Sequence, residues 1–227
     1  MKLTTMLRAG RPPPMVRQRA NCRLRSVGKL RENSMALLVA GLVLFLGIHA
    51  VPMFPAIRTA LTDKLGENGY KGLFSLVSFA GLALTIYGYG EARYDGSPVL
   101  YDPPLWLRHV TMLLMIPVFI FLVAAYMPSK IKKVLKHPML VAVKLWALSH
   151  LLANGDLASV LLFGGFFLWA VLDRISLKRR GPLAGQGPVA GVEPVRYSDV
   201  WVILIGLALY GLFVWKLHVL LIGVPVA

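Results

Sequence analysis

Long apolar stretches alternate with short polar ones along the chain. The six apolar stretches cover residues 36–54, 72–89, 105–126, 139–153, 157–172 and 200–222. A helix that spans a bilayer needs about 20 mostly apolar residues, and somewhat fewer where neighbouring helices shield it. No window shows the sustained period of two that marks the strands of a membrane barrel. The pattern therefore predicts an all-α fold, a polytopic membrane helix bundle of about six transmembrane helices.

Composition supports this interpretation. Of the 227 residues, 57% are hydrophobic and only 15% are charged, and the mean hydropathy is +0.66. A soluble globule is not expected at these values. The net charge of +15 resides in the segments between apolar stretches, where membrane topology explains it and nucleic-acid binding is not expected. The single cysteine, Cys22, excludes an internal disulfide framework, a cysteine-ligated cluster and covalent haem attachment.

The charges of the loops predict how the chain is oriented. Segments 55–71, 127–138 and 173–199 together carry twelve Lys or Arg, whereas segments 90–108, 154–156 and the last stretch carry three. By the positive-inside rule the first group is cytoplasmic, which places both ends of the bundle outside. Segments 139–153 and 157–172 are short and joined by only three residues, so they are expected to form a helical hairpin.

The N-terminal residues do not follow this rule, since residues 1–34 carry nine Lys or Arg and one acidic residue, Glu32. Three explanations remain open: a cytoplasmic tail that inverts the topology, a targeting sequence, or upstream sequence preceding a start at Met35, which we favour. We therefore divide the chain into a basic extension (1–34), a five-helix membrane domain (35–180), a Gly/Pro-rich linker (181–198) and a C-terminal transmembrane helix (199–227).

Histidines are the candidate functional residues, because an ionisable side chain at membrane depth is costly. His49 lies inside the first apolar stretch and His150 inside the fourth. Either residue can make an interhelical hydrogen bond, or the two can ligate a metal or haem iron from facing helices. His109 lies at the outer end of the third stretch, with either a ligand role or a headgroup contact. We expect His137 to be a solvated loop residue and His218 an interfacial one.

Five local patterns go beyond composition. They are GIHAVPMF at 47–54, YGEARYDG at 89–96, WLRHV at 106–110, KHPMLVAVKLWALSHLLANGD at 136–156 and WAVLDR at 169–174. Together they resemble the NnrU family of membrane proteins over roughly residues 36–180. That family is associated with nitrite and nitric oxide reduction in denitrifying bacteria. The resemblance thus implies a bacterial inner membrane, and a redox partner or nitrogen-oxide reductase as partner.

The same architecture is similar to the plant 15-cis-zeta-carotene isomerase, which holds b-type haem between two histidines. The resemblance marks His49 and His150 as the corresponding ligands, and thus haem b as the cofactor. The cysteine implicated in ligand exchange in that enzyme corresponds to Ala147 here, so the thiol for this route is missing.

Depth supplies a further expectation for the haem site. His49 and His150 are expected to differ in level by roughly 10 Å, at a rise of about 1.5 Å per residue. If they are too far apart, His109 is the nearer partner of His150 in depth. Arg93 and Arg108 on the outer side are the candidates to bind the haem propionates.

Three functions remain open from the sequence. The first is a haem-binding NnrU-type protein of nitrogen-oxide respiration. The second is a haem-dependent cis-trans isomerase of a carotenoid-like polyene. The third is a cofactor-free membrane scaffold or accessory protein, in which the histidines serve only for packing.

Overall fold

The computed structural model describes residues 33–181, 191–224 and 226, and its regular secondary structure in these ranges is helical apart from one isolated bridge between Val99 and Asp156. The first helix is Asn33–Met53, whose last turn is the 3-10 turn η1 (Val51–Met53). It is followed by α2 (Pro55–Tyr94), α3 (Trp106–Tyr126), α4 (Lys130–Leu135), α5 (Pro138–Ala153), α6 (Leu157–Arg180), α7 (Ser198–Leu212), the π-helical segment η2 (Phe213–Leu217) and α8 (His218–Ile222).

Five of these helical stretches are long and apolar enough to cross a membrane. They are the first helix, α2, α3, α6 and the continuous stretch Ser198–Ile222, whereas α5 is a shorter apolar helix of 16 residues. The predicted all-α polytopic bundle is therefore confirmed.

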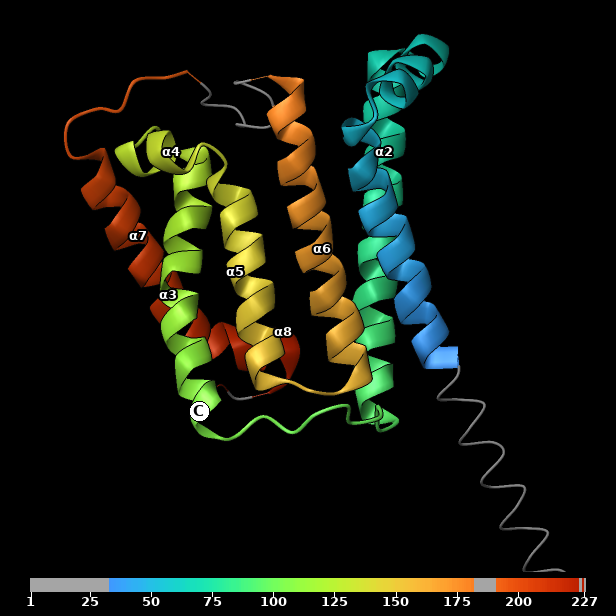
Figure 1. The fold of residues 1–227 in the computed structure, drawn as a ribbon, viewed down its shortest axis with the longest axis vertical. Coiled ribbons are helices and arrows are strands. Elements are labelled where there is room, and N and C mark those ends of the chain that lie inside the picture. Colours follow the sequence, from blue (N-terminus) through green and yellow to red (C-terminus); the bar gives the residue numbers. More distant parts are fainter. Residues whose placement is uncertain (1–32, 182–190, 225, 227) are drawn as a thin grey trace, which may run out of the picture.

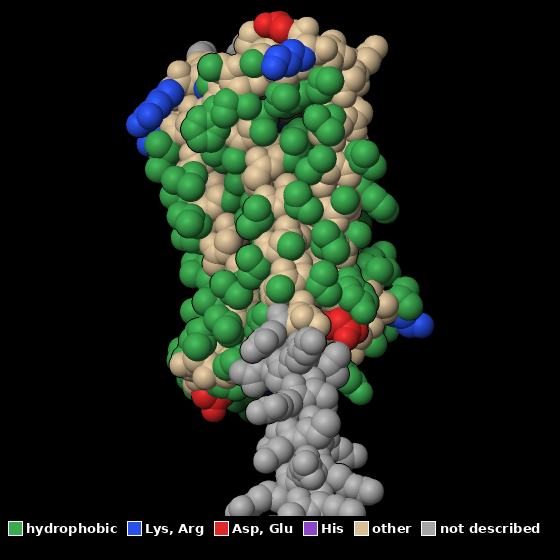
Figure 2. Space-filling model, turned by 90° about the vertical axis from the view of Figure 1, so that its right-hand side faces the viewer, with side chains coloured by type: hydrophobic (Ala, Val, Ile, Leu, Met, Phe, Trp, Pro, Cys, Tyr) green, Lys and Arg blue, Asp and Glu red, His purple; other side chains and the backbone are tan. Residues whose placement is uncertain are grey.

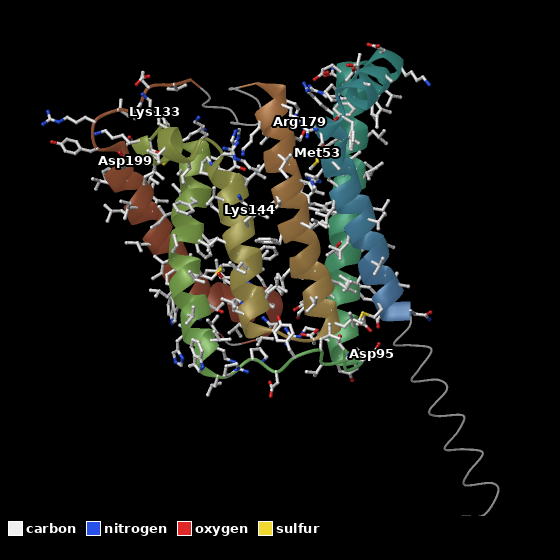
Figure 3. The ribbon with its side chains drawn as sticks, viewed as in Figure 1. Met53, Asp95, Lys133, Lys144, Arg179 and Asp199 are labelled. Carbon is white, nitrogen blue, oxygen red and sulfur yellow. The ribbon has the colours of Figure 1, made fainter. Side chains whose placement is uncertain are left out.

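The helices stand side by side and alternate in direction along the chain (Figure 1). The order across the view is α7, α3, α5 and α6, followed by the first helix together with α2. Apolar side chains cover the flank of the molecule that Figure 2 faces, and charged side chains lie toward its two ends. Met53, Lys133, Arg179 and Asp199 lie toward one end of the bundle and Asp95 toward the other, which is the alternation that the loop charges predict (Figure 3).

Small residues allow the first helix and α2 to pack backbone to backbone. A Cβ at Gly81 would lie 2.6 Å from the backbone nitrogen of Phe45, and one at Gly88 would lie 2.4 Å from that of Leu38. Thr85 lies between these glycines, and its hydroxyl donates a hydrogen bond to the Gly81 carbonyl within the same helix. Close van der Waals contact of this kind is what associates helices in lipid, where no hydrophobic force drives them together.

The α5–α6 hairpin forms as predicted. Asp156 caps the start of α6 by accepting a hydrogen bond from the Ser159 backbone N–H at 3.0 Å. At the preceding end, the Asn154 side-chain amide donates to the His150 carbonyl at 3.0 Å. Three residues therefore suffice to close one helix and open the next.

The segment 55–71, expected as a connecting loop, is helical in the structure and belongs to α2. Pro55 starts this helix at a position where its missing N–H costs nothing. Gly66, with φ 70° and ψ 163°, breaks it into two parts. Hydropathy missed the first part because it is polar on several sides and mostly exposed.

Helix α6 also extends about two turns beyond the predicted 157–172. Asp173 and Arg180 form an ion pair across these turns, with an N–O distance of 2.5 Å and less than a quarter of either side chain exposed. Charged residues lower the hydropathy of a segment, so the predicted span stops before them. They do not end the helix when they form an ion pair along it.

A small helix, α4, occupies the segment expected as a basic loop at 127–138. Its Lys132 is buried and donates to the Ala125 carbonyl at the end of α3, and this burial lowers the pKa of the Lys132 amine. The Ile131 backbone N–H donates to the Asp199 carboxylate at the start of α7. Helix α4 thus ties the ends of α3 and α7 together. The basic extension up to residue 32 and linker residues 182–190 lie outside the described residues.

Candidate functional site

His49 lies near the end of the first helix, in a setting of aromatic rings. Its Nδ1 is 2.7 Å from the Phe45 carbonyl oxygen one turn earlier. The ring tilts against Phe45, with centroids 4.3 Å apart, and meets Phe74 of α2 and Trp169 of α6 edge to face at 5.0 and 6.0 Å.

His150 lies near the opposite end of the bundle, in the last turn of α5. Its Nδ1 is 2.8 Å from the Trp146 carbonyl oxygen. The ring stacks on Phe163 of α6, with centroids 4.6 Å apart, and tilts against Trp146 at 5.4 Å. The two histidines therefore share one arrangement on different helices.

The hydrogen bond to a backbone carbonyl determines which ring nitrogen carries the proton in both imidazoles. A carbonyl oxygen can only accept, so Nδ1 carries the proton in each ring and Nε2 of the neutral ring keeps its lone pair. A metal-ligating histidine commonly holds its other nitrogen on a backbone carbonyl in the same way. Each residue taken singly is thus suited to ligate an iron through Nε2.

Their relative position is less favourable for joint ligation. His49 contacts Trp169 and His150 contacts Phe163, six residues away on α6, which amounts to about 9 Å along the helix axis. One metal holds two imidazole nitrogens about 4 Å apart, since each bond is about 2 Å long. As the side chains stand, the two rings do not fit the two faces of one haem.

Aromatic rings also fill the space between the two histidines. Phe45 contacts Phe166 of α6 at 5.7 Å between centroids, and Phe166 contacts Trp146 at 5.4 Å. With the contacts at either end, these rings connect His49 to His150 without interruption. We call Phe45, Phe166, Trp146 and Phe163 the aromatic bridge.

The other predicted site residues lie toward the end of the bundle at which α2 ends and α3 begins (Figure 1). His109 and Arg108 are exposed in the first turn of α3. Arg93 is exposed near the end of α2, where it donates to the Tyr89 hydroxyl at 3.4 Å and lies over that ring at 5.7 Å. The residues described include no group of three His, Cys, Asp or Glu side chains that could hold a metal ion.

His218 of α8 lies closer to His150 than the sequence indicated. The two imidazoles are near enough to interact electrostatically. The His218 Nδ1 is 2.6 Å from the Val224 carbonyl oxygen, and its ring meets Phe213 edge to face. The π-helical segment η2 lies between α7 and α8 within one continuous helical stretch, Ser198–Ile222.

His137 is not solvated, contrary to the expectation for a loop residue. Only 4% of it is exposed, at the start of α5. It lies close enough to Asp173 of α6 to interact with that carboxylate, which is also paired with Arg180. Pro138, which follows His137, starts α5.

A polar network that the sequence did not predict joins the end of α2 to the start of α6. The fully buried Ser159 donates to the Asp156 carboxylate at 2.6 Å, and its oxygen lies 2.9 Å from the Tyr89 hydroxyl. The signal was present in the sequence, since Tyr89 and Asp156 belong to two of the quoted motifs. A buried network of this kind holds the end of α2 against the start of α6.

The loop 95–105 docks on the α5–α6 turn and completes this network. Tyr101 donates its hydroxyl to the carbonyls of Leu151 and Asn154, and the Gly155 carbonyl accepts from Leu100 and Tyr101 backbone N–H groups. Burial raises the pKa of Tyr101, and the negative charge of Asp156 adds to the effect. The YDPP and LANGD segments thus have a structural role in closing the bundle beneath His150.

Comparison with known proteins identifies the group to which the chain is related. Residues 37–226 match the family model described as NnrU protein, so the match extends past the motifs through the linker and the last helix. No curated protein and no solved structure matches the chain.

Proposed function

Because the chain belongs to the NnrU family, we propose that it is a b-haem-binding protein of the bacterial inner membrane that acts in nitrite or nitric oxide reduction. The observation that carries the haem proposal is the hydrogen-bonding arrangement that His49 and His150 share. Each donates its Nδ1–H to the carbonyl four residues before it, which leaves the Nε2 lone pair available to an iron in an aromatic setting. Haem, when bound, would supply one-electron chemistry.

His150 and His49 are the residues that would hold the haem iron. Neutral imidazoles serve an iron in lipid without adding a charge to the site. Simultaneous ligation of one iron requires the rings of Phe166 and Trp146 to move, because they lie between the two histidines. On the outer side, the exposed Arg93 and Arg108 are the proposed partners of the propionates.

Variants of the full chain test the ligand assignment. We expect His150→Ala and His49→Ala each to lower the ratio of haem to protein after purification from haem-replete cells. Leu113→Ala, which shortens an exposed apolar side chain on α3, is the control and should leave the ratio unchanged. Unchanged ratios in both of the first two variants would overturn the proposed ligands.

The proposed role in nitrite or nitric oxide reduction is tested in a denitrifying host. Deletion of the gene should slow nitrite or nitric oxide consumption, and the wild-type gene should restore it. The proposed partner is a redox protein or a nitrogen-oxide reductase, which cross-linking in the same host should capture. Normal consumption in the deletion strain would contradict the assigned process.

A cofactor-free scaffold is the second candidate, and one observation favours it. The aromatic bridge already packs the space between the histidines, so the described helices pack around their interior without a cofactor. A wild-type protein that is fully folded without haem, and takes none up, would establish this candidate.

The isomerase alternative has less support. Ala147, which stands where the redox-switched enzyme needs a thiol, is fully buried against the core cluster that includes Leu38 and Phe163. A polyene isomerase on this chain would therefore have to work without that ligand exchange. Unaltered carotenoid isomers in a producing host that expresses the gene would exclude it.

A further inference from the structure

A hollow lies beside the break in α2, where the helix changes direction at the cytoplasmic end of the bundle. It has a volume of about 280 Å³. Its lining comes from η1 and from both parts of α2: Pro52, Arg58, Tyr70, Lys71, Phe74 and Ser75. The break at Gly66 allows Arg58 and Lys71, thirteen positions apart, to line one space.

The hollow is suited to an anion because it holds two cations. Arg58 has no carboxylate among its lining neighbours. Lys71 pairs with Glu67 at 3.3 Å, but more than half of each side chain is exposed, so the pair contributes little and can yield to another anion. The Ser75 and Tyr70 hydroxyls supply further hydrogen-bond donors.

The surroundings of the hollow are apolar on the membrane side. Pro52 and Phe74 form part of its wall, and Phe74 also meets the His49 ring at 5.0 Å. Below Ser75, helical spacing places Phe79, Leu82 and Ile86 on the same face of α2. Their exposed fractions are 73%, 41% and 64%. Figure 2 faces the side of the bundle on which the first helix and α2 lie, and hydrophobic side chains cover much of it.

We propose that this hollow binds the headgroup phosphate of an anionic phospholipid of the cytoplasmic leaflet. Arg58 and Lys71 contact the phosphate, and an acyl chain follows Phe79, Leu82 and Ile86 toward the bilayer centre. The cytoplasmic leaflet is the anionic one, and basic side chains at its surface attract such lipids. The row of apolar side chains below the hollow favours a lipid over a free anion, because a free anion has no acyl chain to contact them.

Native mass spectrometry of the detergent-purified protein, titrated with phosphatidylglycerol, tests the proposal. The variant Arg58→Gln/Lys71→Gln should bind the first lipid at least about tenfold more weakly, since each cation near the surface contributes about fivefold. Ser75→Trp, which fills the hollow and keeps the charges, should cause a comparable loss. Glu67→Gln, which removes the competing carboxylate, should strengthen binding.

The matched control is Lys178→Gln/Arg179→Gln, two exposed cations at the same end of the bundle but outside the hollow. It should retain wild-type binding. An equal loss in this control would show diffuse attraction and overturn the site. Displacement of the lipid by millimolar inorganic phosphate, or equal binding of phosphatidylcholine, would overturn the assignment to an anionic lipid. None of these results depends on whether the protein binds haem.

Discussion

The imidazole of His150 stacks on the ring of Phe163, with centroids 4.6 Å apart and planes 26° from parallel. This stack and the hydrogen bond to the Trp146 carbonyl fix the ring at two places, one on its face and one at Nδ1. Orientation of a ligand by its surroundings commonly sets its affinity for a metal. Phe163 is therefore a positioning residue for the proposed iron ligand.

The first prediction follows from this stack. Phe163→Leu keeps an apolar side chain but removes the flat surface, so the His150 ring is held less firmly. We expect haem affinity to fall about tenfold or more, the lower range for loss of an outer-shell contact, and the reduced absorption bands to broaden. The control is Phe79→Leu, because Phe79 is exposed to lipid on α2. Equal affinities of the two variants would contradict a positioning role.

Gly155 carries a second prediction, about stability. A Cβ at this position would lie 1.8 Å from the Tyr101 carbonyl oxygen, where the loop 95–105 docks on the α5–α6 turn. Gly155→Ala should therefore lower the free energy of unfolding by about 3 kcal/mol. Thermal unfolding in detergent measures the change. Gly164→Ala is the control, since no atom lies within 4 Å of its added Cβ, and it should be neutral or slightly stabilising.

A third prediction concerns the alkaline limit of stability. The pKa of Tyr101 is raised in the folded protein by burial and by Asp156, so the folded state keeps the phenol proton after the unfolded chain has lost it. The unfolded state then binds fewer protons, and stability falls as pH rises above about 10. Tyr101→Phe should cost about 1 kcal/mol at neutral pH and should lessen this decline. Tyr87→Phe, at an exposed position of α2, should do neither.

The orientation of the chain gives a fourth prediction. In a Cys22→Ser background, an Asp102→Cys variant should react with a membrane-impermeant maleimide on intact spheroplasts. An Arg179→Cys variant should react only after the membrane is opened, since the positive-inside rule assigns the basic ends of the helices to the cytoplasm. Both residues are exposed, so accessibility within the protein does not decide the result. The reverse pattern would show that the topology is inverted.

Hydropathy predicted most of the fold because a helix that crosses lipid needs about 20 mostly apolar residues. The helices and the tight turn at 154–156 follow from apolar length and the few residues between them. Apolar length did not predict the helical part of 55–71 or the end of α6. The first lies among polar residues before the break at Gly66, and the second depends on a pair, Asp173 and Arg180, seven positions apart.

The sequence supplied candidate site residues and only part of their arrangement in space. The cost of an imidazole in lipid singled out His49 and His150, and counting residues along the helices gave their difference in depth. Sequence periodicity could not show that Phe166 and Trp146 lie between them, since these contacts depend on which faces of three helices meet. The burial of His137 escaped prediction for the same reason.

The absorption spectrum of the purified full chain from haem-replete cells tests the central claim most directly. Oxidised and dithionite-reduced samples of the wild type and of His150→Ala should be compared at equal protein concentration. The account predicts a Soret band and sharp reduced bands in the wild type, and their loss in the variant. A featureless wild-type spectrum at full protein yield, or bands that persist unchanged in His150→Ala, would contradict it.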